Sequence, residues 1–277
     1  GCGIPFFVGR YNRMARIAFI GKGNMGTAIL HGALRVFPKE DMVFCAKTQD
    51  TRRHIYEKTG VEYTDSNAEC ANKCKYLILA VKPQFYEEVI KGIRYMLTPE
   101  HVIISLAPGK TIEELKLELG KDKRIVRAMP NTPAMIGEGM TGLSCRKEEF
   151  SDVELNVLEK LFGACGKAEF IDEALMNAVV CASGSSPAFV YMFIEALADG
   201  AVRCGMPRKQ AYVFAAQAVK GAASMVLETG EHPGALKDKV CSPAGTTIEG
   251  VAALEEYGMR SAVLKASEAV LNKCREM

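Results

Sequence analysis

Residues 16–26 read RIAFIGKGNMG, an apolar run that leads directly into a loop with three spaced glycines. Gly21 allows a tight turn off a strand, Gly23 leaves room for a pyrophosphate beside the backbone, and Gly26 lets a helix pack closely on that strand. The helix that starts here offers free N–H groups to phosphates. Gly-x-Gly-x-x-Gly alone is a weak signal, but its place between an apolar run and an amphipathic helix favours a dinucleotide site over a plain glycine turn.

Strand-like and helix-like segments alternate after this loop. Apolar runs typical of strands buried on both faces occur at 42–46, 76–81, 102–106 and 124–129. Helical patterns separate them, at 24–36, 50–58, 85–96 and 111–119. Such alternation predicts βαβ units with right-handed crossovers that place helices on both faces of a parallel sheet. We therefore predict an α/β fold with a Rossmann-like, doubly wound, mostly parallel sheet.

The character of the sequence changes after about Asp172. Strand signals stop, alanine becomes frequent, and helical patterns with wide apolar faces cover 187–203, 207–228 and 260–274. These helices are interpreted either as a small self-contained bundle or as a dimerisation domain, in which small residues let helices of two chains approach closely. Apolar surface on several sides favours the dimerisation domain. We predict a dinucleotide-binding domain at 14–172 and a helical dimerisation and substrate domain at 173–277.

The first thirteen residues, GCGIPFFVGRYNR, fit neither domain. Their apolar stretch is too short for a signal peptide and lacks a small-residue cleavage site. We interpret residues 1–13 as a tag or a mis-assigned start, with Met14 as the initiator. A short targeting extension is the alternative.

Composition excludes several classes of function. The 277 residues include 35 basic and 33 acidic side chains, a net charge of +2, without the basic stripe that a nucleic-acid surface needs. No apolar run approaches the ~20 residues of a membrane span, so we expect no membrane contact. Ten scattered cysteines without a Cys-x-x-Cys pair, and four isolated histidines, indicate a reducing, cytoplasmic compartment and no metal site.

The choice between the two nicotinamide cofactors is expected near the end of the second strand. An acid about 20 residues past the glycines would bind the ribose hydroxyls of NADH. This chain has Lys47, Thr48 and Arg52 there, and two cations with a hydroxyl suit a 2′-phosphate. We therefore predict NADPH as the cofactor, while Asp50 keeps NADH open.

Two later loops also follow strand ends, where open α/β sheets bind ligands. Residues 80–84 read AVKPQ, and residues 129–134 read MPNTPA. The two prolines of the second loop make it rigid, and Asn131 is predicted to hydrogen-bond a nicotinamide or a substrate.

A helix start near the end of the chain, SPAGTTIEG at residues 242–250, predicts an anion site. Ser242 suits the N-cap and Pro243 the first helical position. Gly245, Thr246 and Thr247 would then present N–H groups and hydroxyls to a small substrate with a carboxylate. A simple capped helix is the alternative explanation of this stretch.

Six motifs together resemble pyrroline-5-carboxylate reductase. In chain order they are IGKGNMG, AVKPQ, MPNTPA, SGSSPAF, HPGALKDKV and SPAGTTIEG, and they span nearly the whole chain from Met14 onward. SPAGTTI and SGSSPAF are far more specific than the glycine loop. The chain departs from the family at Ala244 and Ser186, where glycine is common.

The resemblance implies a Rossmann-like domain, a helical domain that interlocks two chains, a substrate pocket at the dimer interface, and in many members rings of dimers. It implies a cofactor site that includes Lys22, Asn24, Met25, Lys47, Thr48, Asn67, Val81, Lys82 and Lys239. Pro83, Arg52, Asn131 and the three glycines complete the predicted cofactor residues. The predicted substrate residues are Glu173, Ser242, Gly245, Thr246 and Thr247.

The implied reaction is hydride transfer from NADPH, or NADH, to the C=N carbon of 1-pyrroline-5-carboxylate, which gives L-proline in the last step of proline biosynthesis. Thr247 would be the catalytic residue, by hydrogen-bonding the ring nitrogen. Because a cyclic imine is easily protonated, no strong general acid is required, and most of the catalysis is positioning.

Three other functions were weighed. A β-hydroxyacid dehydrogenase needs a lysine in the first long helix of the second domain, but residues 185–205 contain none. A non-catalytic NADP-binding regulator is disfavoured by the intact substrate motifs. Another imine reductase, acting on the six-membered homologue, stays open.

Overall fold

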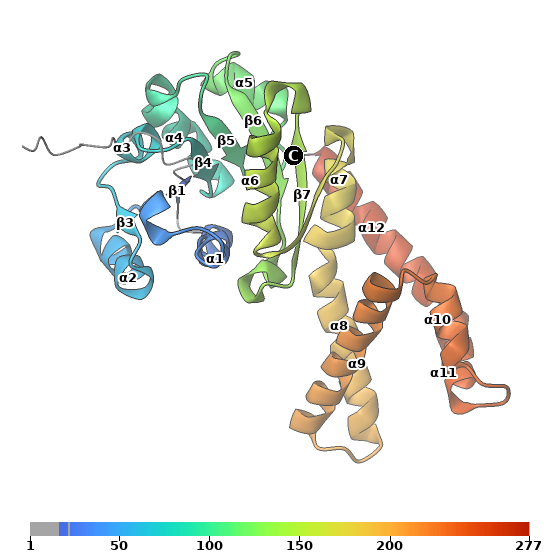
Figure 1. The fold of residues 1–277 in the computed structure, drawn as a ribbon. Helices are drawn as coiled ribbons and strands as arrows, with labels where there is room; N and C mark the ends of the chain where they lie inside the picture. Colours follow the sequence, from blue (N-terminus) through green and yellow to red (C-terminus); the bar gives the residue numbers. More distant parts are fainter. Residues whose placement is uncertain (1–16, 22, 277) are drawn as a thin grey trace, which may run out of the picture. The chain divides into compact units, whose positions relative to one another are not determined.

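The fold is that of a computed structural model, which describes residues 17–21 and 23–276. The predicted extension at residues 1–13 and the predicted cofactor residue Lys22 lie outside the described residues. The chain divides into two compact units, Gly1–Gly184 (unit 1) and Ser185–Met277 (unit 2). Figure 1 labels the helices and strands of both units.

Unit 1 is built on one eight-stranded sheet with the strand order β3-β2-β1-β4-β5-β6-β7-β8. Its strands are β1 Ile17–Ile20, β2 Met42–Cys45, β3 Glu62–Tyr63, β4 Tyr76–Leu79, β5 Val102–Ser105, β6 Arg124–Met129, β7 Gly139–Cys145 and β8 Gly166–Phe170. All neighbouring pairs are parallel except β6 with β7. The chain order reverses direction between β1 and β4, which is where doubly wound sheets bind nucleotides. The predicted fold class is confirmed.

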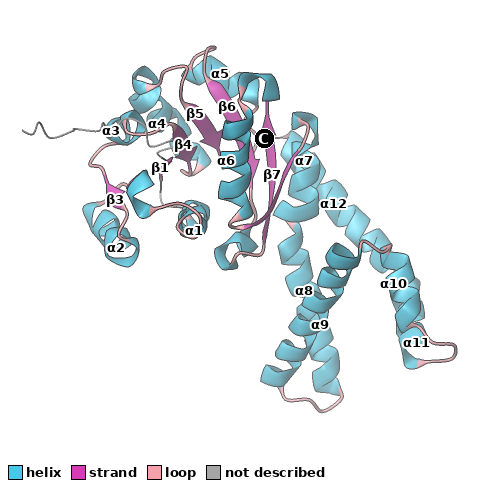
Figure 2. Ribbon diagram, viewed as in Figure 1, coloured by secondary structure: helices cyan, strands magenta, loops and turns pink. Residues whose placement is uncertain are grey.

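Helices cover both faces of this sheet (Figure 2). They are α1 Asn24–Ala33, α2 Gln49–Thr59, α3 Asn67–Asn72, α4 Tyr86–Ile93, α5 Ile112–Leu119, α6 Asp152–Gly163 and α7 Met176–Val179, with short 3-10 turns such as η3 Pro83–Phe85 and η5 Thr132–Ile136. Alternate residues of β1 enter two separate cores: Ile17 and Phe19 pack with α1 and α6, whereas Ala18 and Ile20 pack with α3, α4 and α5. Burial on both faces is why these strands appear in the sequence as continuous apolar runs.

The strands that the sequence did not reveal have a different pattern. β7 contains two glycines and a threonine, and β8, GKAEF, alternates half-buried with exposed residues. β3 is only two residues long. None of the three forms an apolar run, because each lies towards an edge of the sheet or pairs outside the parallel core.

Unit 2 is entirely helical in its described residues. Its helices are α8 Ser186–Arg203, α9 Arg208–Thr229, α10 Pro233–Val240, α11 Thr246–Glu256 and α12 Met259–Arg275. Helices α8 and α9 form an antiparallel hairpin around Ala198, Ala211 and Ala215, and Arg208 pairs with Asp199 near the turn.

Among the described residues of unit 2, only these three alanines are buried. Large apolar side chains stay exposed on all five helices, for example Met192 at 70%, Val213 at 63% and Leu264 at 70%. So much apolar surface is unusual on a single soluble chain and marks an interaction surface. It argues against a self-contained bundle and for a domain that another chain covers.

The helical stretch Glu173–Arg203 is long and apolar enough, by length and composition alone, to cross a membrane. The sequence contains no uninterrupted apolar run of that length, but the mean hydropathy of this helical stretch reaches the limit for a span. The stretch mixes small residues with large apolar ones. Its mean hydropathy is therefore high, although it has no long run of large apolar side chains. A partner protein that covers this apolar surface would also keep it out of water. Length and composition alone are a weak indication of a membrane span.

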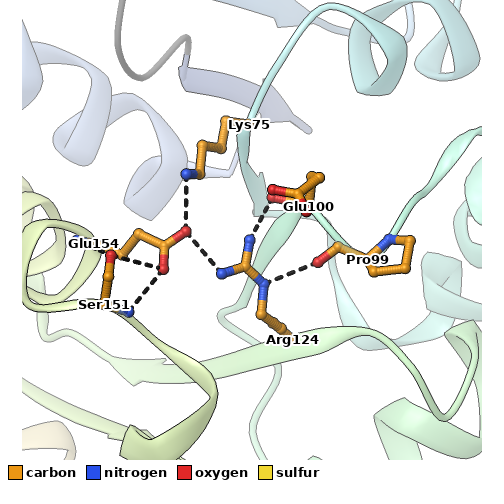
Figure 3. Close-up of polar contacts among 6 residues, drawn as sticks. All are labelled: Lys75, Pro99, Glu100, Arg124, Ser151 and Glu154. Carbon is orange, nitrogen blue, oxygen red and sulfur yellow. Dashed lines mark hydrogen bonds and ion pairs between the residues drawn. The ribbon is translucent and has the colours of Figure 1, made fainter.

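A buried ion-pair cluster joins α6 to the amino ends of β4 and β6 (Figure 3). The carboxylate of Glu154 is 6% exposed and accepts from Arg124 at 2.7 Å and from Lys75 at 2.9 Å. It also accepts from the Ser151 N–H, which completes the capping box of α6. Arg124 donates in addition to the carbonyls of Pro99 and Glu100. Every charge in the cluster is thus paired or hydrogen-bonded, as buried charges require.

The cluster shifts the titration of Glu154. Burial by itself would raise its pKa, but the hydrogen bonds from Lys75, the Ser151 backbone and Arg124 outweigh burial and lower the pKa from 4.5 to about 2. A carboxyl with a lowered native pKa stabilises the fold above its unfolded pKa, and this stabilisation is lost as the pH falls from about 4.5 towards 2.

We predict that Glu154→Gln lowers the free energy of unfolding by about 2 kcal/mol at pH 7, because Arg124 is left without its counter-charge. Urea unfolding at pH 7 and at pH 3 measures this. The difference between variant and wild type should shrink at pH 3. The control Glu159→Gln changes an exposed acid of the same helix and should stay within about 0.5 kcal/mol of wild type. Equal losses in both variants would contradict the assignment.

Candidate active site

The glycine loop lies against the carboxyl end of β4. A Cβ on Gly21, whose φ is 102°, would lie 2.6 Å from Val81 Cγ1 and 2.7 Å from the Ala80 carbonyl oxygen. A Cβ on Gly26 would lie 2.7 Å from Ala80 Cβ. Gly23 is the N-cap of α1 and provides no side-chain cap. The first N–H groups of α1 are therefore left for an anion, as the motif predicted.

A cavity of about 640 Å³ opens beside this loop at the carboxyl ends of β1, β2 and β4. Eight predicted cofactor residues line it: Gly21, Gly23, Lys47, Thr48, Arg52, Asn67, Val81 and Lys82. The predicted residues Asn24, Met25 and Gly26 form the first turn of α1, and Pro83 opens η3 just past Lys82. These residues, predicted from separate parts of the sequence, thus come together at one cavity.

The charge of the cavity suits a phosphorylated ribose. Thr48 caps α2 and places its hydroxyl beside that of Thr51, at 2.9 Å. Lys47 lies over the ring of Phe85, 5.4 Å from its centroid. Arg52 reaches in from α2, and its Nε is buried without a hydrogen-bond partner in the described part of the chain. A glycine cradle, uncapped N–H groups and an arginine whose Nε has no partner among the described residues together fit NADPH.

Other residues of this cavity were not predicted from the sequence. They include Thr51, Asp65, Ser66 and Phe85. Ser66 caps α3 by accepting from the Glu69 N–H, and its Ser-x-x-Glu spacing was a signal that could have located the loop. Asp65 had no such signal, because the two-residue strand before it is too short to show a pattern.

Asn131 is engaged within unit 1. Its side-chain amide donates to the Ser183 carbonyl at 2.9 Å, and its Oδ1 accepts from the Met140 N–H at 2.8 Å. The side chain is buried and links the loop at η5 to β7 and to the segment before α8. A positioning role accounts for these bonds, and binding of a nicotinamide or substrate by Asn131 stays a prediction.

Glu173 also has partners within unit 1. Its Oε1 accepts from Arg127 on β6 at 2.9 Å and from the Ile112 N–H at the start of α5 at 2.7 Å. Its side chain is 32% exposed. The predicted contact with the substrate would have to be made alongside these two bonds.

The second predicted anion site starts differently from the prediction. Ser242 is not the N-cap: residues 242–245 form a turn closed by Gly245 N–H to Ser242 carbonyl, at 3.0 Å, and Gly245 is the N-cap of α11. Pro243 therefore lies in this turn and not in the helix. The reason is Ala244, whose φ of 58° is left-handed and cannot continue a helix from Pro243. Glycine at this position would adopt that conformation without strain.

The correction keeps the anion site itself. Gly245 has no side chain to cap α11, so the N–H groups of its first turn, which begins with Thr246 and Thr247, stay free for a ligand. A Cβ on Gly245 would lie 2.5 Å from Ser242 Oγ, so a side chain there would force the Ser242 hydroxyl to turn away. Lys239, on the preceding helix α10, pairs with Glu231.

Among the described residues, no group of three His, Cys, Asp or Glu side chains could hold a metal ion.

Comparisons with known proteins identify families for both parts of the chain. Residues 173–277 match the family model for pyrroline-5-carboxylate reductase dimerisation, and residues 16–109 match a model described as NADP oxidoreductase, coenzyme F420-dependent. A pyrroline-5-carboxylate reductase of Escherichia coli (strain K12) is 47% identical over 268 residues, which cover 94% of this chain and 96% of that protein.

Solved structures extend the similarity to the fold. A pyrroline-5-carboxylate reductase from Coxiella burnetii has a TM-score of 0.89 and 33% identity, covering 95% of this chain and 98% of that one. A pyrroline carboxylate reductase of Plasmodium falciparum with NADP bound has a TM-score of 0.83 and 30% identity, with the same coverage.

The glycine-rich helix start, the cations beyond it and the second helical unit define a two-domain NAD(P)-dependent oxidoreductase. The identity to known enzymes runs through both units, and it confirms the resemblance first seen in the motifs. The chain belongs to the pyrroline-5-carboxylate reductase family.

We predict that Gly21→Ala weakens NADPH binding by roughly tenfold or more and destabilises the fold by about 2–4 kcal/mol, because the new methyl group overlaps Val81 and the Ala80 carbonyl at a left-handed φ. Isothermal titration and thermal unfolding measure the two effects. In the control Gly163→Ala the new Cβ meets nothing within 4 Å, and both properties should stay near wild type. An unchanged NADPH affinity in Gly21→Ala would show that the loop does not carry the cofactor.

Proposed function

We propose that this protein reduces 1-pyrroline-5-carboxylate to L-proline with NADPH as hydride donor, the last step of proline biosynthesis. The observation that carries the proposal is the 47% identity to a pyrroline-5-carboxylate reductase over 94% of the chain. The glycine cradle and the uncapped start of α11 support it, since the reaction needs one site for a dinucleotide and one for a small carboxylate.

Unit 1 holds the cofactor in this proposal. The N–H groups at the start of α1 bind the pyrophosphate, and the glycines let the backbone approach it. Lys47, Thr48 and Arg52 hold the 2′-phosphate, which makes NADPH the better donor and NADH the poorer one. Asn67, Val81 and Lys82 line the rest of the cavity. When bound, the cofactor supplies a hydride from C4 of its nicotinamide.

The start of α11 holds the substrate in this proposal. The N–H groups and hydroxyls of Thr246 and Thr247 bind the carboxylate, and the Thr247 hydroxyl also hydrogen-bonds the ring nitrogen. The imine nitrogen takes its proton from water before reduction, so that no side chain has to act as a strong acid. The protein's contribution is to fix the ring so that its C=N carbon faces the hydride. Contacts from Glu173, Ser242 and Lys239 belong to the same proposal.

The exposed apolar surface of unit 2 supports a homodimer as the working form. Side chains such as Met192, Val213 and Leu264 would otherwise stay in water. The match of residues 173–277 to a dimerisation family points the same way. Rings of dimers and a cytoplasmic location complete the proposal.

We predict that the purified protein oxidises NADPH when 1-pyrroline-5-carboxylate is added, and that L-proline accumulates in equal amount. The same absorbance assay with NADH and with the six-membered cyclic imine tests the range of cofactors and substrates. A β-hydroxyacid with NADP⁺, followed as formation of NADPH, is the negative control. Turnover of the β-hydroxyacid, with none of either imine, would reject the proposed function.

We predict that Thr247→Ala lowers kcat/KM by roughly one to two orders of magnitude, because the variant cannot form one of the hydrogen bonds that stabilise the transition state. The affinity for NADPH should not change, because unit 1 holds the cofactor. Ser261→Ala, which removes an exposed hydroxyl from α12, is the matched control. Near-wild-type turnover of Thr247→Ala would reject this residue as catalytic.

We predict that light scattering gives a mass of at least twice the 30.2 kDa of one chain at micromolar concentration. The physical reason is the apolar surface of unit 2. A monomer at this concentration would contradict the proposed assembly, and a mass several times larger would support rings of dimers.

A further inference from the structure

Arg52 is positioned by backbone oxygens. Its side chain is 13% exposed, and Nη1 donates to the carbonyls of Ala46 at 3.4 Å and of Asp65 at 3.2 Å. The guanidinium also lies 6.0 Å from the centre of the Tyr63 ring. These contacts use no negatively charged group, so the position of Arg52 does not depend on an ion pair.

The carboxylate of Asp65 faces the same guanidinium. Its Oδ1 lies 3.4 Å from Nη2 of Arg52, while the side chain is 87% exposed. An exposed pair at this distance contributes little to stability. Asp65 also lines the cavity beside Lys47, Thr48 and Ser66. The Asp65 carboxylate therefore lies beside the Arg52 guanidinium, which would hold a 2′-phosphate, but it is not needed to position that guanidinium.

Two physical effects follow from an acid in this place. A phosphate ester with nearly two negative charges is repelled by a carboxylate that shares its cation. A free ribose 2′-hydroxyl is not repelled, and a carboxylate is the acceptor that dinucleotide-binding folds use for it. An acid at this point therefore lowers the ratio of the NADPH affinity to the NADH affinity.

We propose that Asp65 is a specificity-determining residue, which competes with the 2′-phosphate of NADPH for Arg52 and accepts the ribose hydroxyl of NADH. The acid expected at the end of the second strand is thus supplied by the loop after β3. This inference rests on the proposed use of NADPH. Glu88 also lines the cavity, but no ion pair joins it to Arg52 in the described part of the chain.

The test is direct binding of NADPH, NADH and 2′,5′-ADP to Asp65→Asn by isothermal titration. Asparagine keeps the shape of the side chain and the backbone carbonyl that holds Arg52. We expect NADPH and 2′,5′-ADP to bind roughly three- to tenfold more tightly at low ionic strength, with the gain reduced by added salt. NADH should bind about twofold or more weakly, because an amide oxygen accepts the ribose hydroxyl less strongly than a carboxylate does.

Two variants control the test. Glu62→Gln removes an exposed acid from β3, outside the cavity, and should change neither affinity. Arg52→Gln should weaken NADPH and 2′,5′-ADP roughly tenfold or more and leave NADH nearly unchanged. If Asp65→Asn fails to fold, Asp65→Ser removes the same charge and carries the same expectation.

The outcomes separate this inference from the proposed function. An unchanged ratio of NADPH to NADH affinity in Asp65→Asn, or weaker NADPH binding, would overturn the role of Asp65 while the enzyme remains an NADPH-dependent reductase. Wild-type protein that binds neither cofactor would overturn the proposed function and this inference with it.

Discussion

The close packing of the glycine loop against the carboxyl end of β4 is the constraint on which the nucleotide site depends. Gly21 and Gly26 have no room for a Cβ beside Ala80 and Val81, so α1 starts directly against the sheet. That packing brings uncapped N–H groups to the point where the strand order reverses. The position of the cavity beside the loop and the start of α1 depend on this packing.

The two units differ in how far they bury their apolar side chains. Unit 1 buries both faces of its sheet under helices, and the cluster around Glu154 ties α6 to the amino ends of β4 and β6 (Figure 3). Unit 2 leaves most of its apolar side chains exposed, with only a small buried group of alanines in the α8–α9 hairpin. Unit 1 therefore has a hydrophobic core of its own, whereas unit 2 exposes apolar surface. Exposed apolar surface of this kind is what a dimerisation domain requires.

Local pattern predicted much of the fold and of the site. Strands β1, β2, β4, β5 and β6 were found within a residue or two, because burial on both faces leaves a largely apolar run. β7 and β8 were missed, since glycine and alternating polarity hide them. Lys47, Thr48 and Arg52, predicted as cofactor residues, line the cavity, whereas Asp65 was missed because the two-residue strand before it has no pattern.

The sequence by itself determined the class of fold, the family and the phosphate-binding helix start, since each depends on residues close together in the chain. Only the tertiary structure showed that Asp65 meets Arg52, that Glu173 is held by Arg127, and that Asn131 bonds Ser183. It also moved the start of α11 from Ser242 to Gly245 through the left-handed Ala244. Long-range hydrogen bonds and single backbone angles produce no periodic pattern in a sequence. For this reason they could be seen only in the tertiary structure.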